Sequence, residues 1–171
     1  MLTRDQHLLL ARTGAGTPMG NLLRRFWVPA LLSAELPEPG GAPQRVTLLG
    51  EKLVAFRTLD GRVALLAENC AHRGASLYFG RVEADGLRCA YHGWQYAPDG
   101  RCVAMPNMPR DFSTHIAQTA YPCEEGAGVV WAWMGPSESR PALSPLDYLG
   151  IPASQVMVAK RLQRCHWTQA M

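Results

Sequence analysis

The sequence lacks long apolar runs and any strong excess of one charge. Among its 171 residues, 17 Lys and Arg face 14 Asp and Glu, a net charge of +3. That balance is too weak to argue for nucleic-acid binding, and no apolar run approaches the ~20 residues of a membrane span. Leu8–Ala11 is too short for a signal peptide. We therefore expect a cytoplasmic protein that binds neither nucleic acid nor membrane.

Cysteine is also scarce and odd in number, which excludes a complete disulfide framework. The chain has five cysteines, and in a reducing compartment a tight group of them favours metal binding. Cys102, Cys123 and Cys165 lie apart from that group and are expected to be ordinary core or surface thiols. The hydrophobic content of 47% predicts a folded core.

Basic residues are scattered except at two places, Arg24–Arg25 and Lys160–Arg164. We expect both groups on solvated faces, with docking of an acidic partner protein as the alternative.

Two short helices are predicted at the start of the chain. Thr3 and Gln6 form a capping-box pattern for residues 3–13, and Thr17–Pro18 is typical of a cap and first turn for a helix through Arg25. Neither helix carries residues that suggest chemistry, so both are expected to serve packing.

From about residue 44 the apolar period changes to two, which predicts short antiparallel strands. Strands are expected at 45–49, 52–57 and 63–66, and a buried one at 128–134. Asp-Gly pairs at residues 60, 85 and 99 mark tight turns. These features predict a small, mainly β unit over residues 34–136, after a helical segment over residues 1–33.

Residues 137–171 have a different amino-acid composition. Pro136–Pro152 is rich in proline, as linkers are. Val156–Ala159 is expected to be a strand and Cys165–Met171 the beginning of a helix. We interpret residues 137–171 as a linker and the incomplete beginning of a second domain.

The chemistry concentrates in two short motifs, Cys70-Ala71-His72 and Cys89-Ala90-Tyr91-His92. Sixteen residues separate His72 from Cys89. Thiolate and imidazole suit zinc or an iron–sulfur centre, and in a Rieske centre two Cys hold one iron and two His the other. A structural zinc site is the alternative, although zinc fingers group the two Cys and the two His separately.

The motifs CAHRGA and CAYHGW resemble the paired Rieske motifs of ring-hydroxylating oxygenases. The resemblance, which is to the phthalate-dioxygenase-like group of α subunits, extends through LLLARTGAGTPMGNLLRRFWVPALL and AYPCEEGAGVVWAWMGP. It implies a mainly β Rieske-type domain of small antiparallel sheets, short N-terminal helices and a truncated start of an α+β catalytic domain. It also implies a [2Fe–2S] cluster with one iron on Cys70 and Cys89 and the other on His72 and His92, through Nδ1.

The residues around these ligands should form the inner shell of the cluster: Arg73, Gly74, Tyr91, Gly93 and Trp94. Family members usually carry Pro where this chain has Ala71. The disulfide of respiratory Rieske proteins is absent, because Ala75 and Ala90 occupy its positions. A potential nearer about −150 mV than +300 mV is therefore expected.

In the family, electrons pass from a flavin and iron–sulfur reductase through the Rieske part to a mononuclear iron held by two His and a carboxylate. The three remaining histidines, His7, His115 and His166, are expected to lie far apart and not to ligate metal. The chain thus lacks a complete oxygenase site and should act in aromatic-compound catabolism through a catalytic domain or a partner chain. Full-length relatives are homotrimers, whereas this chain alone should be monomeric or weakly associated.

Two other functions stay open. A free-standing Rieske ferredoxin is one, although it would not need the N-terminal helices. A zinc-stabilised interaction module is the other, and a colourless preparation would favour it.

Overall fold

The computed structural model describes residues 3–143, 150–163 and 165–169. The α-helices are α1 (Arg4–Ala11) and α2 (Pro18–Leu23). The strands are β1 (Trp27–Leu32), β2 (Gln44–Leu48), β3 (Glu51–Arg57), β4 (Val63–Ala67), β5 (Arg81–Glu83), β6 (Gly86–Arg88), β7 (Gln95–Tyr96), β8 (Cys102–Ala104), β9 (Ala120–Tyr121), β10 (Cys123–Gly126) and β11 (Val129–Trp133). Short 3₁₀ helices are η1 (Ser33–Glu35), η2 (Leu77–Phe79), η3 (Ser113–His115), η4 (Ser137–Ser139), η6 (Ala153–Gln155) and η7 (Trp167–Gln169).

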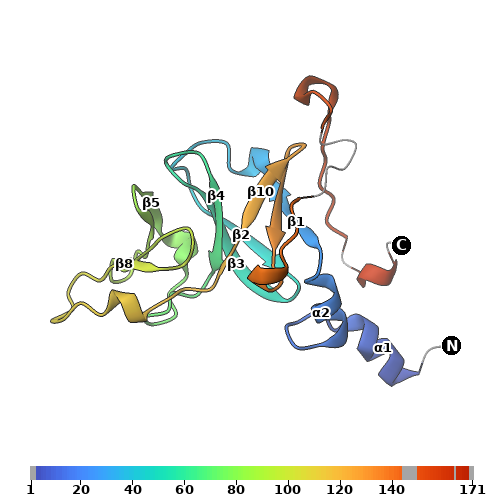
Figure 1. The fold of residues 1–171 in the computed structure, drawn as a ribbon, viewed down its shortest axis with the longest axis horizontal. Coiled ribbons are helices and arrows are strands. Elements are labelled where there is room, and N and C mark those ends of the chain that lie inside the picture. Colours follow the sequence, from blue (N-terminus) through green and yellow to red (C-terminus); the bar gives the residue numbers. More distant parts are fainter. Residues whose placement is uncertain (1–2, 144–149, 164, 170–171) are drawn as a thin grey trace.

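The strands form three antiparallel sheets, which confirms the predicted mainly β class. Their orders are β1-β11-β10, β2-β3-β4-β9 and β5-β6-β7-β8. The sheet with β5 and β8 lies at one end of the molecule and helices α1 and α2 at the other (Figure 1). The hairpin turns fall at the predicted Asp-Gly pairs, so local turn chemistry sets much of this topology.

The sheet β2-β3-β4-β9 separates two cores. Successive strand residues point to opposite faces, so on β3 Val54 and Phe56 join the core next to the sheet β5-β6-β7-β8, whereas Leu53 and Ala55 join the core under β1 and β11. All four side chains are at most 1% exposed. This doubly covered sheet therefore leads through β4 into the first Cys-His motif, and it supports the small sheet that carries the second, between β6 and β7.

The helix predictions at the start of the chain are confirmed. Thr3 and Gln6 form the capping box of α1, and Thr17 caps α2. Arg24, however, does not lie on a solvated face. It is 8% exposed, donates to the carbonyl of Thr13 and pairs with Glu51, because the chain returns over it after β2.

The end of the chain departs from expectation. Val156–Ala159 forms no strand, since no described segment pairs with it. Of the predicted helix at Cys165–Met171, residues 165–169 are described and contain only the 3₁₀ turn Trp167–Gln169. Residues 144–149 of the predicted linker and residues 170–171 lie outside the described residues. The segment still packs on the domain, because Trp167 Nε1 donates to the carbonyl of Leu10 at 3.0 Å and Lys160 pairs with Glu35. No described helix has the length and apolar content to cross a membrane.

Candidate metal site

The two motifs lie on loops with the same backbone. We call residues 70–75 the first loop and residues 89–94 the second loop. In each, the amide of the first residue donates to the carbonyl of the sixth, and the amide of the fifth donates to the carbonyl of the first, at 2.8–3.0 Å. The fifth residue is Gly74 or Gly93, with φ of 70° and 74°, a region that favours glycine. The sequence pattern thus builds one geometry twice.

The two loops meet at the end of the small sheet. The first loop follows β4 and leads into η2, and the second loop joins β6 to β7. The rings of His72 and His92 lie 4.8 Å apart between centroids, and the Cys89 thiol is close enough to Cys70 for that residue to raise its pKa. Residues distant in sequence therefore bring two sulfurs and two imidazoles together.

The sulfurs lie inside and the imidazoles closer to the surface. Cys70 and Cys89 are 4% and 3% exposed, whereas His72 and His92 are partly exposed. Burial raises the pKa of the Cys89 thiol, and the backbone N–H groups of Tyr91 and His92 oppose that rise by donating to the sulfur. A thiolate here needs a cationic partner, which iron supplies.

The imidazoles are suited to metal ligation. Desolvation, together with the charges of His92 and Arg73, lowers the pKa of His72, so its ring is neutral at pH 7 and has a lone pair to donate. Nδ1 of His92 is buried and has no hydrogen-bond partner among the described residues. A buried nitrogen whose lone pair accepts no hydrogen bond is what a metal ligand is expected to have before the metal binds.

The donor set fits a two-iron cluster better than a single ion. In the described part of the chain, no three His, Cys, Asp or Glu side chains gather where they could hold one metal ion. A structural zinc site needs four such ligands at one point. A Rieske centre needs two protein ligands on each of two irons, and two facing Cys-His pairs can supply that.

Aromatic side chains cover the imidazoles unequally. Trp94 is 3% exposed and stacks on His72 with 4.2 Å between centroids and 4° between planes. The Tyr91 ring lies 3.7 Å from the His92 ring between centroids but is 62% exposed, so it shields His92 from water less than Trp94 shields His72. Arg73 is exposed beside His72.

Three residues that sequence analysis did not single out hold the loops. Tyr96 is fully buried, and its hydroxyl lies 3.1 Å from Cys70 Sγ. Gln118 accepts from the Ala71 amide at 3.0 Å and donates to the carbonyls of two residues before the loop at 2.8 Å. Arg88 donates to the Gly93 carbonyl at 2.6 Å. Arg88 could have been suspected because it adjoins Cys89, but nothing local marks Gln118.

The other histidines and cysteines form no comparable site. His7 and His166 were expected far apart, but their rings lie 5.7 Å apart, because the chain's end folds back on α1. His115 lies in η3, on its own element as expected. Cys102 is buried, Cys123 partly buried and Cys165 exposed, and all three are free thiols as predicted.

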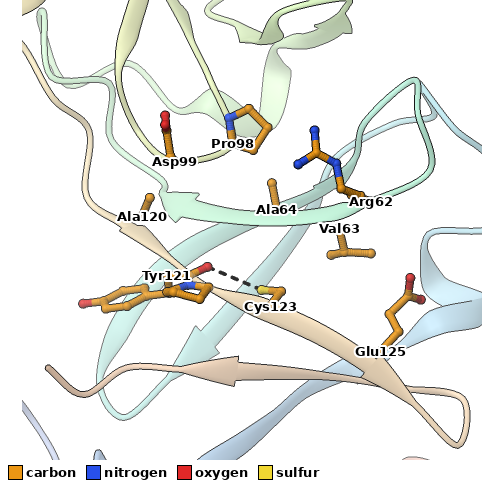
Figure 2. Close-up of a pocket in the computed structure, with 10 residues that line it drawn as sticks. Arg62, Val63, Ala64, Pro98, Asp99, Ala120, Tyr121, Cys123 and Glu125 are labelled. Carbon is orange, nitrogen blue, oxygen red and sulfur yellow. Dashed lines mark hydrogen bonds between the residues drawn. The ribbon is translucent and has the colours of Figure 1, made fainter. Parts of the chain in front are cut away.

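A hollow of about 450 Å³, larger than those beside the loops, lies at β4, β9 and β10. Figure 2 shows Arg62, Asp99 and Glu125 around it and Cys123 close to Tyr121. Each charge has a partner, respectively Asp60, Arg101 and Arg57. Burial raises the pKa of Cys123 to about 12, so its thiol is protonated at neutral pH. Unlike the loops, this hollow brings no sulfur and imidazole groups together.

Comparison with known proteins agrees with this geometry. The Rieske [2Fe–2S] domain family matches residues 26–122. The chain is 48% identical to the 3-chlorobenzoate-3,4-dioxygenase oxygenase subunit of Comamonas testosteroni, over 98% of this chain and 39% of that protein. It is 42% identical to the phthalate 4,5-dioxygenase oxygenase subunit of Pseudomonas putida, over 100% of this chain and 39% of that protein. A crystal structure of dicamba monooxygenase aligns with a TM-score of 0.67 at 29% identity, over 75% of this chain and 40% of that one. The chain thus spans about two fifths of the length of these relatives.

Proposed function

This chain belongs to the Rieske [2Fe–2S] family, and from that premise we propose that it is the electron-relay part of an aromatic-ring-hydroxylating oxygenase. In this proposal Cys70 and Cys89 hold one iron, and His72 and His92 hold the other through Nδ1. Arg73, Gly74, Tyr91, Gly93 and Trp94 form the shell around them. The bound cluster supplies one-electron oxidation and reduction.

The observation that carries the proposal is the pairing of two loops that are closed by the same two backbone hydrogen bonds and a left-handed glycine. Each presents one buried sulfur and one partly exposed imidazole, and the imidazoles are 4.8 Å apart. Backbone amides donate to the Cys89 sulfur, and the Tyr96 hydroxyl lies 3.1 Å from Cys70 Sγ, where it can donate to a thiolate. Such donors stabilise the more negative, reduced state, while the outward imidazoles offer a way to the surface.

The whole oxygenase would need a second site that accepts the electron. We propose that an NAD(P)H-dependent flavin and iron–sulfur reductase supplies electrons in the cytoplasm, and that a mononuclear iron in a catalytic domain or partner chain receives them. The names of two relatives point to benzoate- or phthalate-like aromatic acids, with hydroxylation, dihydroxylation or O-demethylation as the reaction. A homotrimer is proposed for the complete protein, with this chain alone monomeric or weakly associated.

The first test is the metal content and the paramagnetic resonance of the purified chain. We expect two irons and two acid-labile sulfides per chain, and a resonance signal after reduction with dithionite. Cys89→Ser and His92→Ala should both lose the visible absorption of the cluster. Cys123→Ala should retain it, because that thiol lies in another sheet.

The alternatives give different results in the same experiment. A colourless protein with one zinc per chain and no signal would replace the relay with a zinc-stabilised module. A free-standing ferredoxin would give the cluster spectrum but would have no catalytic domain to serve. Sequencing the coding DNA beyond codon 171 for two His and an acid separates these two relay functions.

A further inference from the structure

An exposed aromatic side chain stands beside the second loop. Phe79, at the end of η2, is 67% exposed, and two hollows of about 320 and 280 Å³ flank it. Both hollows are lined by Phe79 and Arg81, and the larger one reaches Cys89. We call Phe79 and Arg81 the ridge. A protruding ring between two hollows is a shape that suits insertion into a partner.

The surroundings of the ridge are positive. Arg81 and Arg88 share the single carboxylate of Glu83, at 2.6 and 2.7 Å. Arg45 lies over the Phe79 ring, 5.2 Å from its centroid, but it is paired with Glu68 at 2.7 Å, so the excess positive charge comes from Arg81 and Arg88. With two guanidinium groups on one carboxylate, the ridge favours a negatively charged partner surface.

Strand register places the ridge at the cluster end of its sheet. Arg81 pairs with Arg88, which directly precedes Cys89, whereas Glu83 pairs with Gly86 at the opposite end. Arg101 also lies at that opposite end. It directly precedes Cys102, and Cys102 pairs with Tyr96, the residue of β7 that lies farther from the second loop. The ridge therefore lies next to a cysteine ligand, on the sulfur side of the site rather than at the imidazoles.

We infer that the ridge docks the acidic face of the one-electron donor protein. This inference rests on the proposed relay function and deepens it, since it separates the place where an electron enters from the imidazoles. Phe79 would insert into an apolar recess of the donor, and the hollow beside Cys89 would accept one donor side chain. The guanidinium of Arg81 would face donor carboxylates.

The test uses the cluster-loaded chain and a reduced plant-type [2Fe–2S] ferredoxin as the donor, whose potential lies below that of a Rieske centre. Cluster reduction is followed by stopped-flow absorbance, with dithionite as a small reductant in parallel. The test variants are Phe79→Ala and Arg81→Glu. Arg101→Glu is the matched control, because Arg101 is 76% exposed and paired with a carboxylate two residues away, as Arg81 is at 77%. Phe26→Ala, at 60% exposure, controls for loss of an exposed ring.

We expect both ridge variants to lower the second-order rate constant with ferredoxin at least about fivefold, and both controls to stay within about twofold. Rates with dithionite should not change. Equal slowing by Arg81→Glu and Arg101→Glu would overturn the inference, because net charge alone would then act. A rate unaffected by Phe79→Ala would also overturn it.

Two other results are distinguishable. If a second copy of the chain covers the ridge, the wild type sediments as a dimer that Phe79→Ala dissociates, and the inference fails. If the chain binds no cluster, dithionite produces no absorbance change in any variant, and the relay function itself fails.

Discussion

The first and second loops share their backbone but differ in what holds them. An uncharged amide, Gln118, supports the first loop with three hydrogen bonds to backbone groups. A guanidinium, Arg88, supports the second loop and is itself fixed by Glu83 and Gln95. Loops closed by the same backbone hydrogen bonds therefore do not require identical support, and the two loops should respond differently to mutation, charge and pH.

The two sulfurs differ in the same way. Cys70 faces the hydroxyl of Tyr96 at 3.1 Å, whereas Cys89 receives the backbone amides of its own loop. A mutation can remove the Tyr96 hydroxyl without moving the backbone, so the hydrogen bond to Cys70 can be changed without changing those to Cys89.

The largest effect should come from removing the two supports. Gln118→Leu leaves three backbone groups without their partner, and it should lower the free energy of unfolding by about 2–4 kcal/mol with little change in potential.

Arg88→Met should lower the free energy of unfolding less, because this side chain is 25% exposed. It should, however, lower the potential by roughly 40 mV, about 1 kcal/mol, since a positive charge near the reduced cluster is lost.

Urea unfolding and redox titration measure the two effects. Gln155→Leu, on an exposed 3₁₀ turn, is the neutral control for the first. Arg88→Lys keeps the charge but not the fork, so it should retain most of the potential. If Gln118→Leu lowered the potential as much as Arg88→Met, the distinction between an uncharged and a charged support would be wrong.

The next effect compares the two glycines. In the described part of the chain, a Cβ on Gly74 meets no atom within 4 Å, whereas one on Gly93 comes within 2.9 Å of the Pro106 ring. Gly74→Ala should therefore lower the free energy of unfolding by about 1 kcal/mol, the cost of a left-handed backbone at alanine. Gly93→Ala should lower it by about 2 kcal/mol, because its Cβ also meets Pro106. Thermal unfolding of the loaded proteins measures both. Equal costs would mean that the second loop shifts away from Pro106 without penalty.

The loops and the strands β2, β3, β4 and β11 could be predicted because their determinants are local. Spacing, a glycine after each His and Asp-Gly turns lie within a few residues of what they shape. Gln118 reaches the first loop from 47 residues away, and β1 pairs with β11 across the whole domain; no local pattern encodes either contact. Val156–Ala159 shows the converse. Its apolar residues are typical of a strand, but this local pattern does not supply a second strand for it to pair with.

A smaller effect should follow from removing the hydroxyl at the first sulfur. Burial and the neighbouring Cys70 thiol raise the pKa of Tyr96, so the phenol stays protonated and donates to the sulfur. Tyr96→Phe should lower the potential by a few tens of mV, because a donor to the reduced state is lost. Tyr121→Phe is the control: its hydroxyl meets Glu51 in another part of the protein, so it should leave the potential unchanged. A shift of the same size in both variants would contradict the assignment.

The smallest expected effect is a difference in pH dependence between the charged support of the second loop and the uncharged support of the first loop. Hydrogen bonds from Arg81 and then Arg88 lower the pKa of Glu83 below its ordinary value of 4.5. A carboxylate with a lowered pKa contributes stability above that ordinary value and loses it as the pH falls through its folded pKa. At pH 7, Glu83→Gln should therefore release the cluster faster than wild type, measured as decay of visible absorbance, and the two should converge only as the pH falls below 4.5 and through the lowered pKa of Glu83. Gln118→Leu should keep its ratio to wild type over the same range, because an amide does not titrate and protonation of the ligands acts equally in both proteins. A Glu83→Gln ratio that stays constant from pH 7 through the acid range in which the wild-type Glu83 carboxylate becomes protonated would mean that the charge of Glu83 does not support the second loop.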